Sequence, residues 1–273
     1  MSSSDRLRRI QVVASSRLHF GLLSFGHSQR RQFGGVGVMI QQPTCKLDFT
    51  SSSSFDVSGK LSDRVVAFVH HWTQWHGHSE LPLCRIEVKS VAREHVGLGV
   101  GTQLGLSVAS GLNRLSGRPE VPITELVQSV GRGARSAVGS YGFLSGGLIV
   151  DAGKTDAEQI SPLEARLPVP ASWRWVLICP QQGSGLSGER EGQAFEQLPP
   201  VSEAVSERLK NEIQEEILPA VREHQFERFA QAVFRFGERA GSCFATVQGG
   251  AYHGQELIRR VDWLRSLGIE GVG

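Results

Sequence analysis

Residues 94–109 read EHVGLGVGTQLGLSVA, and this stretch decides the fold. Glycines stand at the alternate positions Gly97, Gly99 and Gly101, and an apolar run of small residues follows them. Glycine permits backbone conformations with positive φ and lets a ligand approach the backbone closely. A helix that begins near Thr102 would direct its unpaired N–H groups and the positive end of its dipole into the loop. The stretch therefore predicts a pocket for an anion, most often a phosphate. Its predicted binding residues are Gly97, Gly99, Gly101, Thr102 and Gln103.

The glycine spacing differs from that of the two commonest nucleotide-binding loops. A dinucleotide-binding G-x-G-x-x-G would need a third glycine where Thr102 or Leu104 stands, and it would lie at the tip of the strand expected over residues 83–88. A Walker A loop would need Gly-Lys-Ser/Thr, which does not follow. The remaining alternative to an anion loop is a glycine cluster that serves packing alone.

The composition is that of a globular protein, with 40% hydrophobic and 21% charged residues. A length of 273 residues suits one large domain or two joined halves. A proline-bearing linker over residues 161–170 marks a boundary. We therefore divide the chain into residues 1–165, which carry the glycine loop, and residues 166–273.

Charge and cysteine usage limit the partners and the compartment. The net charge of +2, without a basic run, gives no reason to expect nucleic-acid binding. No apolar segment resembles a signal peptide or is long enough to span a bilayer, so we expect a cytoplasmic protein without membrane contact. The cysteines lie far apart without a C-x-x-C pair, which suits reduced thiols. They are Cys45, Cys84, Cys179 and Cys243.

Hydrophobic periodicity predicts an α+β protein whose first half is rich in strands and whose second half is rich in helices. Strands are expected over residues 10–16, 18–25, 38–42, 46–50, 83–88, 146–151 and 173–179. Helices are expected over residues 62–75, 102–115, 123–130, 201–218, 221–239 and 256–267, with a separation near Pro219.

Two further segments carry cationic side chains in patterns that suit a ligand. Strand alternation places Arg17, His19 and Gly21 on one face, where a cation and an imidazole need a polar partner. The glycine-rich loop over residues 131–136 presents Arg132 and Arg135, which flank Gly133 and precede Ser136. Guanidinium groups on such a loop suit phosphate or carboxylate. The alternatives are a satisfied core histidine and a solvated turn.

Histidines gather near the end of the helix expected over residues 62–75. They are His70, His71, His76 and His78. No carboxylate or cysteine completes the spacing of a metal site, so we expect none here.

As an ordered set, several segments resemble the β-ribofuranosylaminobenzene 5′-phosphate synthases, a family of the GHMP kinase superfamily. The matching segments are residues 17–22, 33–37, 97–104, 131–136, 146–153 and 185–190. The resemblance implies a ribosomal-S5-like N-terminal domain and a ferredoxin-like C-terminal domain. It also implies condensation of 4-aminobenzoate with phosphoribosyl pyrophosphate, with release of CO2 and pyrophosphate, in tetrahydromethanopterin synthesis.

The implied reaction gives the candidate residues their roles. Arg17, Arg132 and Arg135 would clamp carboxylate and phosphate, and His19 would orient a hydroxyl or assist the leaving pyrophosphate. The glycine loop, with Gly133 and Ser136, would bind substrate. Mg²⁺ would accompany the pyrophosphate, with Glu94 or Asp151 as a ligand. We also expect a homodimer.

The alternative activity is that of an ATP-dependent small-molecule kinase of the same superfamily. Many of those kinases carry a catalytic aspartate a few residues after a Ser-Gly and before a Gly-Gly. Between Ser136 and Gly146 this chain has no carboxylate, which favours the synthase. A binding protein without turnover is a third interpretation. Because the family typically continues beyond a Gly-Val-Gly such as residues 271–273, we expect the sequence to be incomplete at its C-terminus.

Overall fold

A long antiparallel hairpin organises the computed structural model, which describes residues 8–27, 29–179 and 198–272. Its strands are β1 (Arg9–Ser24) and β2 (Phe33–Ser51). Each joins two strands that were predicted separately. Strand β1 pairs with one edge of β2, while β4 (Cys84–Ser90) and β5 (Leu148–Asp151) share the other edge. The short strands β3 (Asp56–Gly59) and β6 (Leu163–Leu167) complete the six-stranded sheet.

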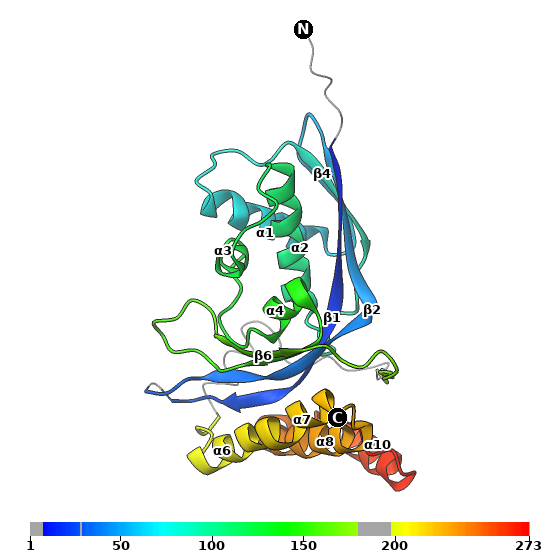
Figure 1. Cartoon of the computed structure of the whole chain (residues 1–273). Coiled ribbons are helices and arrows are strands. Elements are labelled where there is room, and N and C mark those ends of the chain that lie inside the picture. The colour runs from blue at the N-terminus through cyan, green and yellow to red at the C-terminus, as the bar shows by residue number, and fades with distance from the viewer. Residues whose placement is uncertain (1–7, 28, 180–197, 273) are drawn as a thin grey trace.

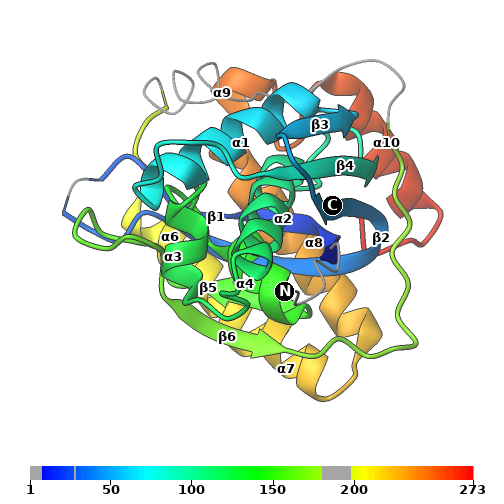
Figure 2. The ribbon, with the colours of Figure 1, turned by 90° about the horizontal axis from the view of Figure 1, so that it is seen from above.

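Helices form two groups on different parts of this hairpin, as Figure 1 shows. The first group is α1 (Ser62–Trp75), α2 (Val100–Leu115), α3 (Ile123–Gln128) and α4 (Val138–Ser145). The second group is α6 (Glu203–Asn211), η1 (Glu212–Ile217), α7 (Leu218–Arg222), α8 (Phe226–Ser242), α9 (Ala245–Gln248) and α10 (Gln255–Ser266). Seen from above in Figure 2, α2 lies centrally, where it contacts β1, β2, α1, α3 and α4.

The hairpin contributes to two hydrophobic cores. Val12 and Ala14 of β1 pack in the core shared with α1 and α2. Farther along β1, Leu18 and Phe20 pack against the second core, which includes residues of α7 and α8. The hairpin register shifts between Ala14 and Ser16 and again between His19 and Gly21. Such irregularities re-aim side chains and are frequent next to active sites.

The second register shift corrects one prediction. Arg17 and His19 do share a face, but Gly21 does not lie with them, because Phe20 is an extra residue in β1 relative to β2. A Cβ at Gly21 would stand 2.4 Å from the Cβ of Ala240 in α8. Glycine at this position therefore lets α8 approach the strand instead of facing the glycine loop.

Several other boundaries also differ from those predicted. Residues 173–179 form no strand, although their alternation is strand-like. Trp173 and Trp175 instead pack their rings against Phe229. Helical structure continues through Pro219, at the junction of η1 and α7. Proline has no N–H to donate to the preceding turn, and the carbonyl of Glu215 there accepts from Arg228 Nη2 at 2.6 Å. The helices separate farther along, where His224 has a φ of 57°.

The expected division after residue 165 falls inside β6, and the two-domain division remains a prediction. Beyond β6, the regular elements within the described part of the chain are helices. None of the helices described is both long and apolar enough to cross a membrane.

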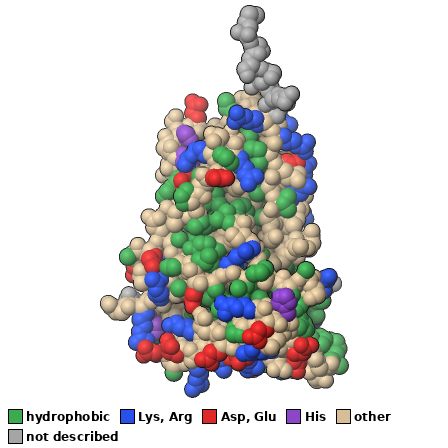
Figure 3. Space-filling view, in the orientation of Figure 1, with side chains coloured by type: hydrophobic (Ala, Val, Ile, Leu, Met, Phe, Trp, Pro, Cys, Tyr) green, Lys and Arg blue, Asp and Glu red, His purple; other side chains and the backbone are tan. Residues whose placement is uncertain are grey.

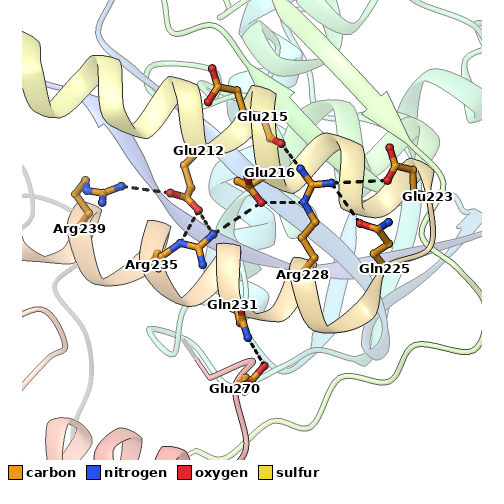
Figure 4. A network of polar contacts seen from close by, with 10 residues as sticks. All are labelled: Glu212, Glu215, Glu216, Glu223, Gln225, Arg228, Gln231, Arg235, Arg239 and Glu270. Carbon is orange, nitrogen blue, oxygen red and sulfur yellow. Dashed lines mark hydrogen bonds and ion pairs between the residues drawn. The ribbon is translucent and has the colours of Figure 1, made fainter.

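Charged side chains hold η1 against α8, as Figure 4 shows. Arg228 Nε donates to Glu216 at 2.8 Å, and Arg235 Nε donates to Glu212 at 2.9 Å. Arg239 reaches the second oxygen of Glu212 at 3.5 Å. On the face drawn in Figure 3, acidic and basic side chains intermingle over this helical layer, below a largely apolar area.

Close packing between α2 and β2 predicts a stability difference between two glycine substitutions. A Cβ at Gly111 of α2 would stand 2.2 Å from the ring of the buried Phe49, so Gly111→Ala should lower the free energy of unfolding by about 1–3 kcal/mol. Gly237 of α8 has only Phe20 O near its Cβ position, at 3.6 Å. Gly237→Ala should be neutral or raise that free energy by up to about 1 kcal/mol. Urea denaturation measures both, and equal effects would contradict the packing explanation.

Candidate active site

The glycine loop adopts the arrangement that its sequence predicts. Gly99 has a φ of 69° and caps α2, which begins at Val100, two residues earlier than expected. The N–H groups of Thr102 and Gln103 both donate to Gly99 O at 3.1 Å. Because these two groups are already paired, an anion at the start of α2 would meet the N–H groups that precede them, those of Val100 and Gly101. Gly97 has a φ of 81° and open space where a Cβ would lie.

Strand β1 fixes this loop through both backbone and side chain. Arg17 N donates to Leu98 O at 3.0 Å, and Leu98 is buried. A Cβ at Gly99 would lie 3.2 Å from the Cβ of Arg17 and 3.3 Å from its Nε. The Arg17 side chain also passes Gly139, whose Cβ position lies 3.4 Å from Arg17 Cδ. Glycine at both positions makes room for the guanidinium stem.

Two more guanidinium groups meet at Gly101, in the first turn of α2. A Cβ there would lie 2.7 Å from Arg64 Nη2 and 3.3 Å from Arg132 Nη2. Arg132 also stands over the Phe68 ring, with its Cζ 4.9 Å from the centroid. Burial, together with the charges of Arg64 and Arg135, lowers the pKa of Arg132. The site thus concentrates positive charge beside a helix N-terminus.

A second part of the site is a chain of polar groups that joins β1 to β5. His19 Nε2 lies 3.0 Å from Ser136 Oγ, and Ser136 Oγ donates to Asp151 Oδ2 at 2.7 Å. Asp151 is fully buried and also accepts from Ser161 Oγ and from the backbone N–H groups of Ala137 and Gly153. Burial raises the pKa of Asp151, while its four hydrogen bonds oppose that shift. Since all four partners donate, the ionised carboxylate is the form that satisfies them.

This network assigns the proton on His19. Because the Ser136 hydroxyl gives its only proton to Asp151, it must accept from His19. The imidazole proton therefore lies on Nε2, and Nδ1 is an acceptor. Burial, and secondly the charge of Arg17, place the pKa of His19 well below its ordinary value. The site consequently holds a neutral imidazole beside guanidinium groups.

Gln103 connects the two parts. Its side chain is buried in α2, and its Nε2 donates to Gly139 O in α4 at 2.9 Å. Ser136 lies two residues before the start of α4, so this bond helps to fix Ser136 relative to the glycine loop. The predicted substrate role of Gln103 stays a prediction, but the structure gives it a positioning role.

Most of the predicted residues come together here. Around the start of α2 lie Arg17, Gly99, Gly101 and Arg132. His19 and Ser136 contact each other in the second part of the site. Gly133 lies elsewhere, because its Cβ position faces Val127 and Gln159 O, which indicates a packing role. Residues 185–190 fall outside the described residues.

The carboxylates proposed for Mg²⁺ differ in how well they fit it. Asp151 does not fit, because four donors occupy its buried oxygens. Glu94 is partly exposed and forms an ion pair with Arg64. Among the residues that the structure describes, no three His, Cys, Asp or Glu side chains gather as a protein metal site would require. His76 instead packs its ring against Trp72.

Sequence reasoning missed Arg64 and the structural use of Asp151. Arg64 lies in the first turn of α1, where its neighbours suggest only a helix surface. Asp151 was considered only as a ligand of Mg²⁺ bound with the substrate pyrophosphate. In both cases the deciding partners are distant along the chain, so a local motif could not identify them.

Comparison with known proteins identifies relatives that match most of the chain. No family model matches the chain. A β-ribofuranosylphenol 5′-phosphate synthase of Archaeoglobus fulgidus is 31% identical over 243 residues, which cover 84% of this chain and 75% of the relative. The protein of the same name from Methanothermobacter thermautotrophicus is 28% identical over 285 residues, covering 96% and 84%.

Solved structures confirm the predicted GHMP-kinase-like α+β fold. Mevalonate pyrophosphate decarboxylase from Streptococcus pyogenes superposes with a TM-score of 0.64 at 10% identity, covering 98% of this chain and 85% of that one. Phosphomevalonate kinase from Streptococcus pneumoniae gives 0.62 at 12% identity, covering 96% and 97%. At these identities the likeness shows the fold alone.

The buried His19 predicts a pH dependence of stability. Its folded pKa lies below the ordinary value of 6.5, so below that pH the unfolded chain binds a proton that the native chain does not. The free energy of unfolding should therefore fall as the pH drops through 6.5 toward the lowered pKa, by at most about 1.4 kcal/mol per pH unit. His19→Gln keeps a donor for Ser136 and should reduce this fall. Denaturation at pH 7.5 and 5.5 checks it, and an identical fall in both proteins would contradict it.

Proposed function

The chain belongs to the family of β-ribofuranosylphenol 5′-phosphate synthases, and we propose that it condenses 4-aminobenzoate with phosphoribosyl pyrophosphate. The products are a C-riboside 5′-phosphate, CO2 and pyrophosphate, in tetrahydromethanopterin biosynthesis. The observation that carries this proposal is the juxtaposition of a glycine loop, several guanidinium groups and a neutral histidine. Such a site suits two anionic substrates and a reaction in which the leaving group gains negative charge.

The glycine loop and the start of α2 suit the pyrophosphate. As the bond from C1 of the ribose to pyrophosphate breaks, negative charge collects on the leaving group. Fixed N–H groups and guanidiniums stabilise such developing charge without reorganising. Arg132 lies on this side of the site, next to Gly101.

Arg17 lies between the loop and α4, where it suits the carboxylate of the aromatic acid. The ring carbon that bears the carboxylate attacks the cationic C1, and CO2 then leaves with its bonding electrons returning to the ring. The carboxylate must stay ionised until that step, and a guanidinium holds it without giving up a proton. Arg135, whose charge acts on Arg132, is a second candidate for this role.

His19 would accept a hydrogen bond from substrate. Its Nε2 proton is directed to Ser136, so the group offered to substrate is the lone pair of Nδ1. This favours orientation of a substrate hydroxyl or amino group over proton donation to pyrophosphate, which were the two possible roles. Mg²⁺, if it enters with pyrophosphate, would find one partly exposed carboxylate, Glu94, which fits its habit of binding few protein ligands.

The kinase alternative has weaker support from the site. The buried carboxylate closest to Ser136 is Asp151, and its acceptors are already filled by four donors. It is therefore poorly placed to remove a proton from an alcohol. The relatives' name raises a second question, because it specifies a phenol, which suggests 4-hydroxybenzoate as a competing substrate.

Release of CO2 tests the reaction and its substrate together. Carboxyl-labelled 4-aminobenzoate should yield labelled CO2 only when phosphoribosyl pyrophosphate is present, and Arg132→Ala should raise the KM for that substrate. Release from 4-hydroxybenzoate alone would overturn the aminobenzoate assignment and keep the synthase. ATP-dependent phosphorylation of an alcohol, without CO2 from either acid, would select the kinase. Unchanged kinetics of Arg132→Ala would remove Arg132 from the site.

Removal of the imidazole tests the role of His19. His19→Ala should lower kcat/KM for CO2 release by about ten- to hundredfold, because one substrate hydrogen bond and its orientation are lost. His70→Ala is the matched control, since His70 is exposed on α1. Equal activity of the two variants would show that His19 is a structural residue only.

A further inference from the structure

The first turn of α2 is flanked by guanidinium groups from two other elements. Arg64 comes from α1 and Arg132 from the loop before α4, yet both Nη2 atoms approach Gly101. Any side chain at Gly101 would collide with them, so glycine keeps this place open to the arginines. The two charges are close enough for Arg64 to lower the pKa of Arg132. The two positive charges repel each other, and an anion nearby would relieve this repulsion.

The carboxylate that meets this need in the structure is Glu94, which pairs with Arg64. Within the part of the chain that the structure describes, no carboxylate pairs with Arg132 in this way. Its Nε is fully buried and has no hydrogen-bond partner among the described residues, while its guanidinium rests on the Phe68 ring. The ring fixes the guanidinium plane without neutralising its charge. The pair of arginines is therefore only partly compensated.

We propose that Arg64 and Arg132 form a two-guanidinium clamp for pyrophosphate at Gly101, and that Glu94 holds Arg64 until the anion binds. The clamp deepens the proposed function and rests on it for the identity of the anion. The two Nη2 atoms converge on the Cβ position of Gly101, at 2.7 and 3.3 Å. Two guanidiniums this close suit the adjacent phosphoryl groups of pyrophosphate, because each can donate paired hydrogen bonds to phosphoryl oxygens. A single phosphate offers the pair fewer oxygens and less negative charge than pyrophosphate does.

Glu94 is suited to exchange partners. The side chains of Arg64 and Glu94 are 35% and 26% exposed, so their ion pair contributes little to stability and is easily broken. Glu94 also lies three residues before Gly97, at the start of the same loop. Pyrophosphate, with more charge than a carboxylate, would displace it from Arg64.

Calorimetric titration with inorganic pyrophosphate in EDTA tests the clamp without metal and without turnover. Arg64→Ala should weaken binding by about ten- to hundredfold, the effect of one charged hydrogen-bonding group. Glu94→Gln should tighten binding by about two- to fivefold, because the competing carboxylate is gone. In the double variant the Glu94→Gln effect should shrink. Inorganic phosphate should bind more weakly than pyrophosphate and depend less on Arg64.

Matched controls come from the exposed ion pair of Arg85 and Asp56 on β4 and β3. Arg85→Ala and Asp56→Asn should leave pyrophosphate binding unchanged, and thermal melting should show every variant folded. Wild-type affinity in Arg64→Ala, or weaker binding in Glu94→Gln, would overturn the clamp. If the enzyme releases CO2 but binds pyrophosphate equally well without Arg64, the clamp is wrong and the synthase proposal stands. If pyrophosphate binding depends on Arg64 but no CO2 is released, the synthase proposal is wrong and the clamp stands.

Discussion

One backbone hydrogen bond, from Arg17 N to Leu98 O, ties the glycine loop to the strand that carries Arg17 and His19. It joins the middle of β1 to the glycine loop, so the Arg17 side chain lies against Gly99 and Gly139. The start of α2 is thereby fixed relative to the hairpin. Gln103 then carries that placement from α2 to α4 through Gly139 O. A loop with larger residues could not lie this close to the strand.

The site holds the buried carboxylate of Asp151 and several arginines without pairing them, because Asp151 has hydrogen-bond donors of its own. Asp151 accepts from hydroxyl and amide donors, and no guanidinium is among the four. The carboxylate therefore orders Ser136 and His19 without neutralising the arginines around Gly101. A buried carboxylate paired directly with Arg132 would have cancelled the positive charge that an anionic substrate requires.

The sequence predicted the features that depend on nearby residues. Helix α1 has the predicted bounds, since its apolar stripe is regular. The loop that carries Gly97 and Gly99 leads into a helix as expected. Helix α4 was missed because its glycines and serines hide any periodicity. Arg64 pairs with Glu94, which lies 30 residues farther along the chain. The hydroxyl groups that donate to Asp151 come from residues 15 positions before it and 10 positions after it. A local sequence pattern does not encode such contacts.

The extra residue at Phe20 has a consequence for how this strand is compared with its relatives. Before it, one set of alternate residues faces the glycine loop; after it, the phase is reversed, and Gly21 faces α8. The alternation of side chains between the two faces of β1 therefore changes phase at Phe20. An alignment that assumes one regular alternation along the whole strand would assign the residues after Phe20 to the wrong face. Residues on the two sides of Phe20 must be matched to relatives separately, each against its own helix layer.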